Sequence, residues 1–140
     1  MMRIIVTHPN LKATADQDET PVSIGELAAV DPATCLSIHL ADCMDYVSIA
    51  ERQKLLETAV SKLRMGGIIT ISGTDLSAIG RKLSSGNITT QQVNASLHKG
   101  RMSVIHCSEV IDQIRGIGLE IVNYKVDGLY YSIKARRPNG

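Results

Sequence analysis

The sequence predicts an α/β fold, and three features carry this prediction. A run rich in β-branched residues opens the chain at Met2–Thr7, a helical pattern from Ser48 leads into the apolar strand Ile68–Ser72, and Asp127-Gly128 separates two further strand patterns. A helix that feeds a continuous apolar strand is typical of a parallel sheet with helices on both faces, and Asp-Gly between strands predicts a hairpin. We therefore expect a mixed, mostly parallel sheet of about five or six strands that ends in an antiparallel hairpin.

The best-specified element is a helix that begins after Ser48. Ser48 and Glu51 have the spacing of a capping box, and we expect Gly66 or Gly67 to end the helix in the left-handed conformation. Between these limits the apolar residues recur on one face, as in an amphipathic helix. The apolar face comprises Leu55, Leu56, Ala59, Val60 and Leu63, and the face expected to meet water comprises Arg52, Gln53, Glu57, Ser61 and Lys62.

The segments before this helix are less regular. Leu11–Val22 is acidic and has no apolar period, which predicts a loop, and Ser23–Val30 fits either a short strand or a helical turn. Thr34–Leu40 alternates and predicts a second strand. The alternation would place Cys35, Ser37 and His39 on one side of that strand and Leu36, Ile38 and Leu40 on the other.

Three helices and two strands are predicted in the second half of the chain. Short helices are expected at Asp75–Leu83 and Thr89–Leu97, the second opened by a capping box of Thr89 and Gln92. Ser108 is the expected N-cap of a further helix, at residues 109–117. The final strands are expected at 119–126 and 129–135.

Size and charge limit the classes of function. The 140 residues suit a single domain, 1–140, and the net charge of +1 gives no overall attraction for nucleic acid or for an acidic membrane. No apolar run approaches the roughly 20 residues of a membrane-spanning helix, and the N-terminus does not resemble a secretory signal. The cytoplasm is therefore the expected compartment.

The cysteines and histidines do not form a recognisable site. Three cysteines in irregular spacing suit a reducing compartment. His39 and Cys43 lie four residues apart, but neither they nor the adjacent His106 and Cys107 have a familiar ligand spacing, so we expect no metal. The chain also has no Gly-x-Ser-x-Gly motif, and the catalytic residues stay unknown.

The order of elements resembles the class I S-adenosylmethionine-dependent methyltransferases. Leu63-Arg64-Met65-Gly66-Gly67 before an apolar strand is similar to the Leu-Lys-Pro-Gly-Gly of that family, with Met65 in place of proline. The segment 41–47 resembles the family's segment after its fourth strand, and residues 116–121 and the final hairpin follow in the family's order. The resemblance implies a Rossmann-like fold over roughly residues 23–135.

The cofactor-binding half departs from the family pattern. The resemblance implies a Gly-rich turn after the first strand, against the methionine part of S-adenosylmethionine, but here that strand is followed by Thr7-His8-Pro9-Asn10 and no glycine precedes Gly25. The stretch up to Thr34 is too short for the usual two intervening βα units. The resemblance therefore implies a shortened, degenerate member with an abbreviated N-terminal half, as in bacteriophage-type proteins.

The resemblance also points to residues that would bind S-adenosylmethionine in an active enzyme, at the ends of two strands. Each of them has a structural alternative, because acidic residues cap helices and a tyrosine can cover the edge of a core. These candidate cofactor-binding residues are Asp42, Asp45, Tyr46, Thr74 and Asp75.

Three functions are compatible with the sequence. The first is a methyltransferase-like domain that lacks the Gly-rich cofactor loop, binds no cofactor and acts as a binding or assembly module, through a protein partner or by self-association. The second is an active small methyltransferase that binds S-adenosylmethionine by an atypical loop, where the protein would mainly orient donor and acceptor. The third is a subunit of a virion or complex that self-associates through a sheet edge or helix surface.

Overall fold

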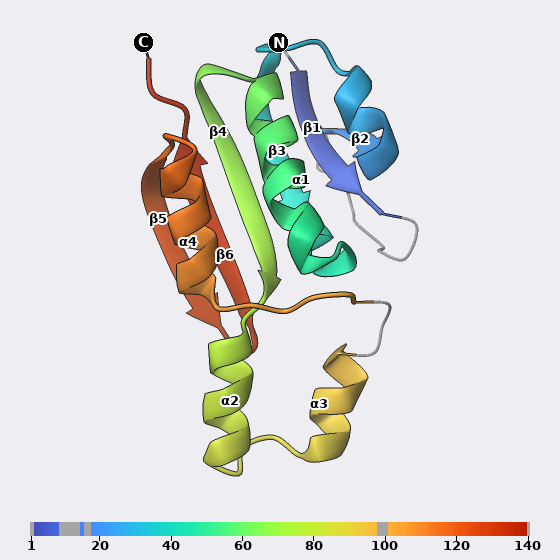
Figure 1. The fold of residues 1–140 in the computed structure, drawn as a ribbon, viewed down its shortest axis with the longest axis vertical. Helices are drawn as coiled ribbons and strands as arrows, with labels where there is room; N and C mark the ends of the chain where they lie inside the picture. Colours follow the sequence, from blue (N-terminus) through green and yellow to red (C-terminus); the bar gives the residue numbers. More distant parts are fainter. Residues whose placement is uncertain (1, 9–14, 16–17, 98–100, 140) are drawn as a thin grey trace.

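A six-stranded mixed sheet organises the molecule, which we describe from a computed structural model (Figure 1). The structure describes residues 2–8, 15, 18–97 and 101–139. The strand order is β2-β1-β3-β4-β6-β5; β1 to β4 are parallel, and β6 is antiparallel to both β4 and β5. The strands are β1 (Met2–Thr7), β2 (Thr20–Ser23), β3 (Cys35–Ala41), β4 (Leu63–Thr74), β5 (Glu120–Asp127) and β6 (Tyr130–Arg136). The predicted fold class and the terminal hairpin are confirmed.

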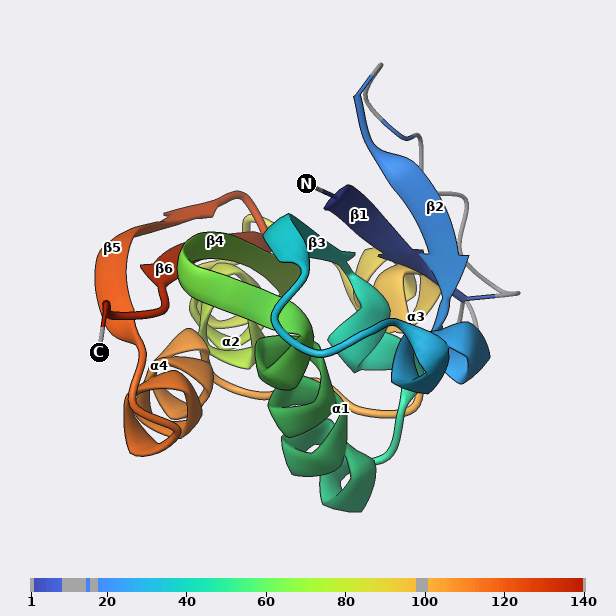
Figure 2. The ribbon, with the colours of Figure 1, turned by 90° about the horizontal axis from the view of Figure 1, so that it is seen from above.

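Helices cover one face of this sheet, which corrects the expectation of two covered faces. α1 (Ile49–Lys62) and α4 (Cys107–Gly116) lie on the same side of the strands (Figure 2). On the other side, the described part of the chain presents a row of paired residues that is largely polar: His39, Thr70, Lys134 and Asn123. Parallel strands covered on both sides would carry apolar residues there. The polar row therefore fits a face that none of the described helices covers.

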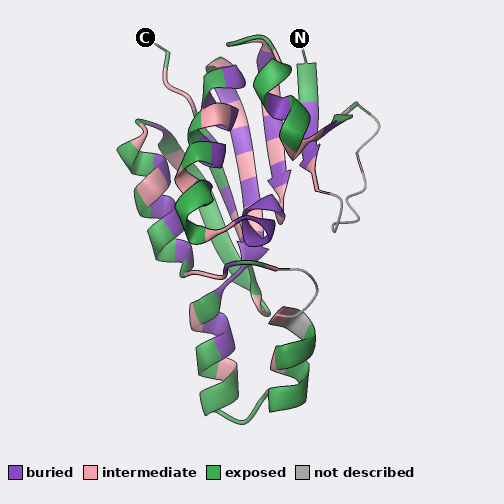
Figure 3. Cartoon of the chain, turned by 45° about the vertical axis from the view of Figure 1, so that its right-hand side comes forward, coloured by how far each residue is buried: buried purple, intermediate pink, exposed green. Residues whose placement is uncertain are grey.

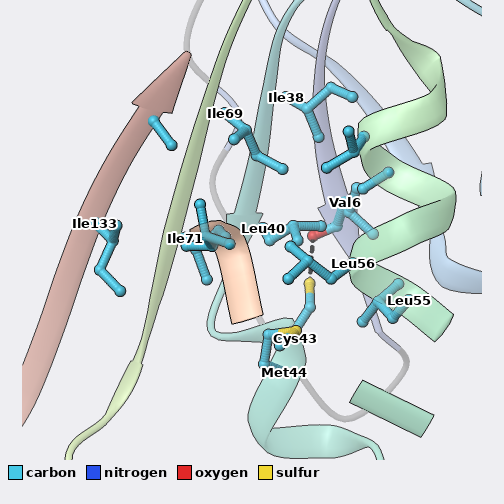
Figure 4. Packing of buried hydrophobic residues seen from close by; sticks show 14 of the residues in the cluster. Val6, Ile38, Leu40, Cys43, Met44, Leu55, Leu56, Ile69, Ile71 and Ile133 are labelled. Atoms are coloured by element: carbon cyan, nitrogen blue, oxygen red, sulfur yellow. Dashed lines mark hydrogen bonds between the residues drawn. The ribbon is translucent and has the colours of Figure 1, made fainter. Parts of the chain in front are cut away.

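The hydrophobic core lies between the sheet and these two helices. Alternate strand residues point into it, and Figure 4 shows Leu40, Ile71 and Ile133 from three strands packed toward Leu56 of α1. The register places Val6, Leu40, Ile71 and Ile133 in one row across the sheet. Aliphatic side chains make up most of the core, which also contains Met44, Tyr131 and the three cysteines.

The start of α1 was predicted correctly, but its end and its polar face were not. The Ser48 hydroxyl accepts the Glu51 amide at 3.3 Å. The helix ends at Lys62 rather than at the glycines, because β4 begins directly at Leu63 and the positive-φ Gly66 lies within that strand. Arg52 and Lys62, expected in water, are 0% and 8% exposed. Each has a partner in the fold, and Lys62 Nζ donates to the Ala28 carbonyl at 3.1 Å.

The N-terminal third contains a strand that the sequence did not reveal. The expected loop 11–22 lies partly outside the described residues, but its end is wrong: Thr20–Ser23 forms β2, parallel to β1. Of the two alternatives for the next segment, the helical turn is correct, as the 3-10 helix η1 (Ile24–Ala29). In β3 the predicted alternation fails at Cys35, which lies in the core with Ile38 because the register shifts between Cys35 and Ser37.

Two helices form an arm beyond the carboxyl ends of the strands. α2 (Leu76–Ser84) and α3 (Thr90–Leu97) lie outside the sheet and are largely exposed (Figures 1 and 3). The capping box of α3 is confirmed, since Thr89 and Gln92 exchange bonds of 2.8 and 3.1 Å. α4 begins earlier than predicted and is capped at His106 instead of Ser108.

Candidate functional site

The candidate residues gather where β1, β3 and β4 end. Asp42 follows β3 directly, and the short 3-10 helix η2 (Cys43–Tyr46) then carries Asp45 and Tyr46 beneath the end of β4. Thr74 is the last residue of β4, and Asp75 comes next. In parallel sheets, ligands bind beyond the carboxyl ends of the strands, so these residues have the placement that the sequence predicted.

Asp45 is the centre of a buried polar network. Its side chain is 0% exposed, and Oδ2 accepts the Thr74 amide at 3.0 Å and Arg101 Nε at 3.2 Å. Arg52 Nη2, from α1, lies 3.5 Å from Oδ1. Two guanidinium groups therefore compensate one buried carboxylate, of which Oδ2 is hydrogen-bonded and Oδ1 is ion-paired with Arg52 but accepts no hydrogen bond.

A single extended segment closes this edge of the molecule. Residues 101–106 run from the arm to α4 across the ends of β3 and β4 (the orange segment in Figure 1). The amides of Met102 and Ser103 donate to the Asp45 carbonyl at 2.6 and 3.2 Å. Arg52 donates to the carbonyl and the hydroxyl of Ser103 at 2.7 and 2.6 Å, and that hydroxyl donates to the Val47 carbonyl at 2.7 Å. Five hydrogen bonds thus fix the segment to η2, to Val47 and to α1.

Tyr46 is held between two side chains of the same chain. The ring of His8, the first residue after β1, stacks on the Tyr46 ring with centroids 5.2 Å apart and planes 22° apart. The Arg101 guanidinium lies 5.8 Å from the centroid of the same ring, within the range of a cation–π contact. Tyr46 is consequently only 5% exposed.

Asp75 and Thr74 are also engaged within the fold. Asp75 Oδ2 accepts the Ala78 amide at 3.1 Å as the N-cap of α2, and Oδ1 accepts the Cys107 amide at 2.9 Å at the start of α4. One carboxylate therefore caps two helices and joins the arm to the body. Thr74 is 0% exposed and gives its amide to Asp45.

Asp42 differs from the other four candidates. It is half-buried, it adopts the left-handed conformation with φ +60°, and its side chain makes no capping bond to η2. Its amide donates to the Ser72 carbonyl at 3.1 Å. Asp tolerates this conformation better than most residues, so the backbone needs no glycine here.

Burial sets the protonation chemistry of the site. Desolvation raises the pKa of Asp45, against the opposing effect of Thr74 and the two arginines. Desolvation and the nearby carboxylates of Asp42 and Asp45 raise the pKa of Cys43 to about 12. The Cys43 thiol donates to the Val6 carbonyl at 2.8 Å and stays protonated at neutral pH, so it is no nucleophile.

Several residues of this site had no signal in the sequence. Arg52 looked like a surface residue of an amphipathic helix, and Arg101 and Ser103 lie in a segment without any periodic pattern. Among the described residues no group of three His, Cys, Asp or Glu side chains could hold a metal ion. Four polar atoms of the site are buried without a hydrogen-bond partner: Asp45 Oδ1, Arg52 Nη1, Thr74 Oγ1 and Tyr131 Oη.

A separate depression of about 880 Å³ lies on the uncovered face of the sheet. Its polar lining includes Ser37, His39, Thr70 and Lys134, and it lies away from the carboxyl-end cluster. The two features therefore belong to different surfaces of the molecule.

Several solved structures that match this chain are described as methyltransferases. A chain of an O-methyltransferase family protein from Burkholderia thailandensis matches 88% of this chain with a TM-score of 0.62 and 15% identity. The chain has the class I methyltransferase fold. A possible histamine N-methyltransferase from Thermotoga maritima matches 85% at TM-score 0.60 and 13% identity. A structure of the Haloferax volcanii Trm112 methyltransferase activator with a putative methyltransferase matches 91% at 0.61 and 12%.

This methyltransferase-fold chain is shorter than the proteins it matches. It covers 37% of the Burkholderia chain, 63% of the Thermotoga chain and 64% of the Haloferax chain. No family model and no curated protein matches the sequence. Within the described residues, no helix has the length and apolarity to span a membrane.

Proposed function

We propose that this chain is a non-catalytic binding or assembly module that uses a methyltransferase fold without a cofactor site. The observation that carries the proposal is the engagement of the candidate cofactor residues by their own chain. Asp45 is bound by Thr74, Arg101 and Arg52, and Asp75 caps two helices. A ligand that used Asp75 or Oδ2 of Asp45 would first have to break hydrogen bonds within the fold, and one that used Oδ1 of Asp45 would have to displace its ion pair with Arg52.

The residues after β1 support the same proposal. In the family pattern a glycine turn allows a close approach of the cofactor to the backbone, whereas here His8 follows the strand and stacks on Tyr46. The stacked pair lies beyond the ends of β1 and β3, where the methionine part would be bound. The module would thus keep the scaffold of the family and use its surfaces for protein contacts.

Asp42 supports the alternative, an active small methyltransferase with an atypical cofactor loop. It is the candidate residue that remains partly accessible, and its carboxylate makes no cap to η2. A carboxylate at the end of β3 could accept hydrogen bonds from a cofactor. The protein would then orient the methyl donor and acceptor, with few diagnostic side chains.

Calorimetric titration with S-adenosylmethionine and with S-adenosylhomocysteine separates the two functions. If the chain is a non-catalytic module, we expect no heat of binding even at millimolar ligand. A dissociation constant in that range corresponds to a binding free energy of only about 4 kcal/mol. Micromolar binding that is lost in Asp42→Ala and kept in the matched exposed variant Asp112→Ala would establish the alternative and contradict the module.

A protein partner is the second part of the proposal. One matched structure is described as a complex of a methyltransferase activator with a putative methyltransferase, so this fold can carry a protein on its surface. Cytoplasmic location and the absence of nucleic-acid binding remain expectations from the composition and charge.

A further inference from the structure

β5 is an exposed strand at one edge of the sheet. It pairs with β6 on one side and with no other described strand, and seven of its eight residues are exposed (Figure 3). Three of these are large apolar residues: Val122 is 47%, Tyr124 59% and Val126 40% exposed. An edge of this length and character is a template for pairing with another strand.

The opposite edge of the sheet is protected. β2 has four residues, and Pro21 within it offers no amide for a further strand. The described strands therefore leave β5 as the edge suited to pairing. If two copies pair through their β5 strands, neither copy has another edge suited to pairing, so the assembly ends as a dimer.

We propose that a second copy of this chain pairs with β5 in an antiparallel arrangement about a two-fold axis at Tyr124. In this register Tyr124 lies opposite the partner's Tyr124 and Asn123 opposite the partner's Lys125, while Val122, at the irregularity between Ile121 and Asn123, lies near the partner's Val126. The apolar residues of one edge then meet the apolar residues of the other, and no like charges are opposed. Paired aromatic and β-branched side chains of this kind stabilise adjacent strands.

The neighbouring registers are less favourable for reasons of charge and polarity. A shift of the axis to Lys125 would place two lysines directly opposite each other, and a shift to Asn123 would place Lys125 opposite Ile121. Any register that pairs Tyr124 with Lys125 would place the α4-covered face of one copy and the uncovered face of the other on the same side of the joined sheet. The two-fold axis at Tyr124 avoids all three conflicts.

This inference rests on the proposed function, because it names the partner of the assembly module. The two can fail separately. A strict monomer that does not bind S-adenosylmethionine would overturn the dimer alone, and a dimer that binds S-adenosylmethionine would overturn the non-catalytic module alone.

Cross-linking through engineered cysteines tests the register. The native cysteines 35, 43 and 107 are buried, so a new cysteine on β5 is the accessible thiol among the described residues. Opposed residues of antiparallel strands have Cα atoms about 4.5–5.5 Å apart, which suits a disulfide. We expect Tyr124→Cys to form a covalent dimer on mild oxidation, whereas Asn123→Cys and Lys125→Cys cross-link when mixed with each other and not alone.

Two further measurements complete the test. Ser85→Cys, exposed at the end of α2, reports the rate of random collision. Light scattering should show a dimer of the wild-type chain, and Tyr124→Lys should raise its dissociation constant at least about tenfold. A wild-type monomer at all concentrations, or Tyr124→Cys that cross-links no faster than Ser85→Cys, would overturn the proposal. Circular dichroism checks that each variant is folded.

Discussion

The guanidinium of Arg52 lies 3.5 Å from the Asp45 carboxylate, with side chains that are 1% and 0% exposed. This pair links α1 to η2 and, through Ser103, to the segment that leads into α4. The elements that meet at the carboxyl end of the sheet are therefore joined by polar contacts as well as by the core.

Arg52→Ala should destabilise the protein by about 3–5 kcal/mol, because it leaves the Asp45 carboxylate buried with one of its two arginines. Chemical denaturation followed by circular dichroism measures the change. The matched control is Arg136→Ala, which removes an ion pair with Glu120 of 2.9 Å between side chains that are about half exposed. That loss should be within about 1 kcal/mol, and equal losses for the two variants would contradict the buried network.

Gly73→Ala should destabilise the protein by about 1–3 kcal/mol through overpacking. A Cβ at Gly73 would lie 2.7 Å from Tyr131 Oη and 2.9 Å from Asp45 Oδ1, and both of these side chains are buried. In α2, Gly80 has no atom within 4 Å of such a Cβ, so Gly80→Ala should stabilise the helix by about 0.5–1 kcal/mol. Thermal unfolding of both variants should give melting temperatures that move in opposite directions.

The pKa of Cys43 predicts a loss of stability in alkali. Folding raises this pKa from 9.0 to about 12, so between these pH values the folded chain keeps a proton that the unfolded chain releases. The contribution of the Cys43 thiol to the free energy of unfolding is fully present below pH 9. It falls as the pH rises, by roughly 1 kcal/mol at pH 10. The difference in unfolding free energy between wild type and Cys43→Ala, measured from pH 7 to pH 10, should shrink accordingly. A difference that is constant with pH would contradict a buried neutral thiol.

Arg101→Ala should loosen the segment across the strand ends without unfolding the sheet. Its guanidinium bonds Asp45 and lies over Tyr46, and the next two amides donate to the Asp45 carbonyl. Hydrogen exchange at Met102 and Ser103 should accelerate at least about tenfold, which corresponds to about 1.4 kcal/mol, while the amides of β4 keep their protection. Equal acceleration in β4 would indicate global destabilisation instead of a local opening.

The sequence predicted those elements whose local signals agree with the final structure. The Ser48 cap, the strand around Ile69 and the turn at Asp127-Gly128 each depend on neighbouring residues, and all three are confirmed. β2 was missed because Pro21 and its short length gave no strand pattern, and this strand forms through its pairing with β1. The end of α1 was misplaced because glycine is also used inside β4, where Gly66 takes a positive φ.

The sequence predicted where the candidate residues lie in the fold, but not which side chains surround them. The ends of β3 and β4 lie together because parallel strands present their carboxyl ends at one edge, and this follows from the fold alone. Arg52 was expected on the solvent-facing side of the helix, because a charged residue beside an apolar stripe usually faces solvent. Its burial depends on Ser103, 51 residues away along the chain, and no local pattern encodes a contact of that separation.

The arm formed by α2 and α3 is attached to the body of the molecule at both of its ends. Asp75 forms a bridge with Ile105, and its carboxylate also accepts the Cys107 amide. The chain therefore leaves the sheet and returns to it at almost the same point. A short turn could replace residues 77–103 only if it also supplied the contacts of Ser103, whereas a new insertion at the exposed tip near Gly86 would leave the sheet intact. The tip is thus the place where a tag or a longer recognition loop can be grafted onto this scaffold.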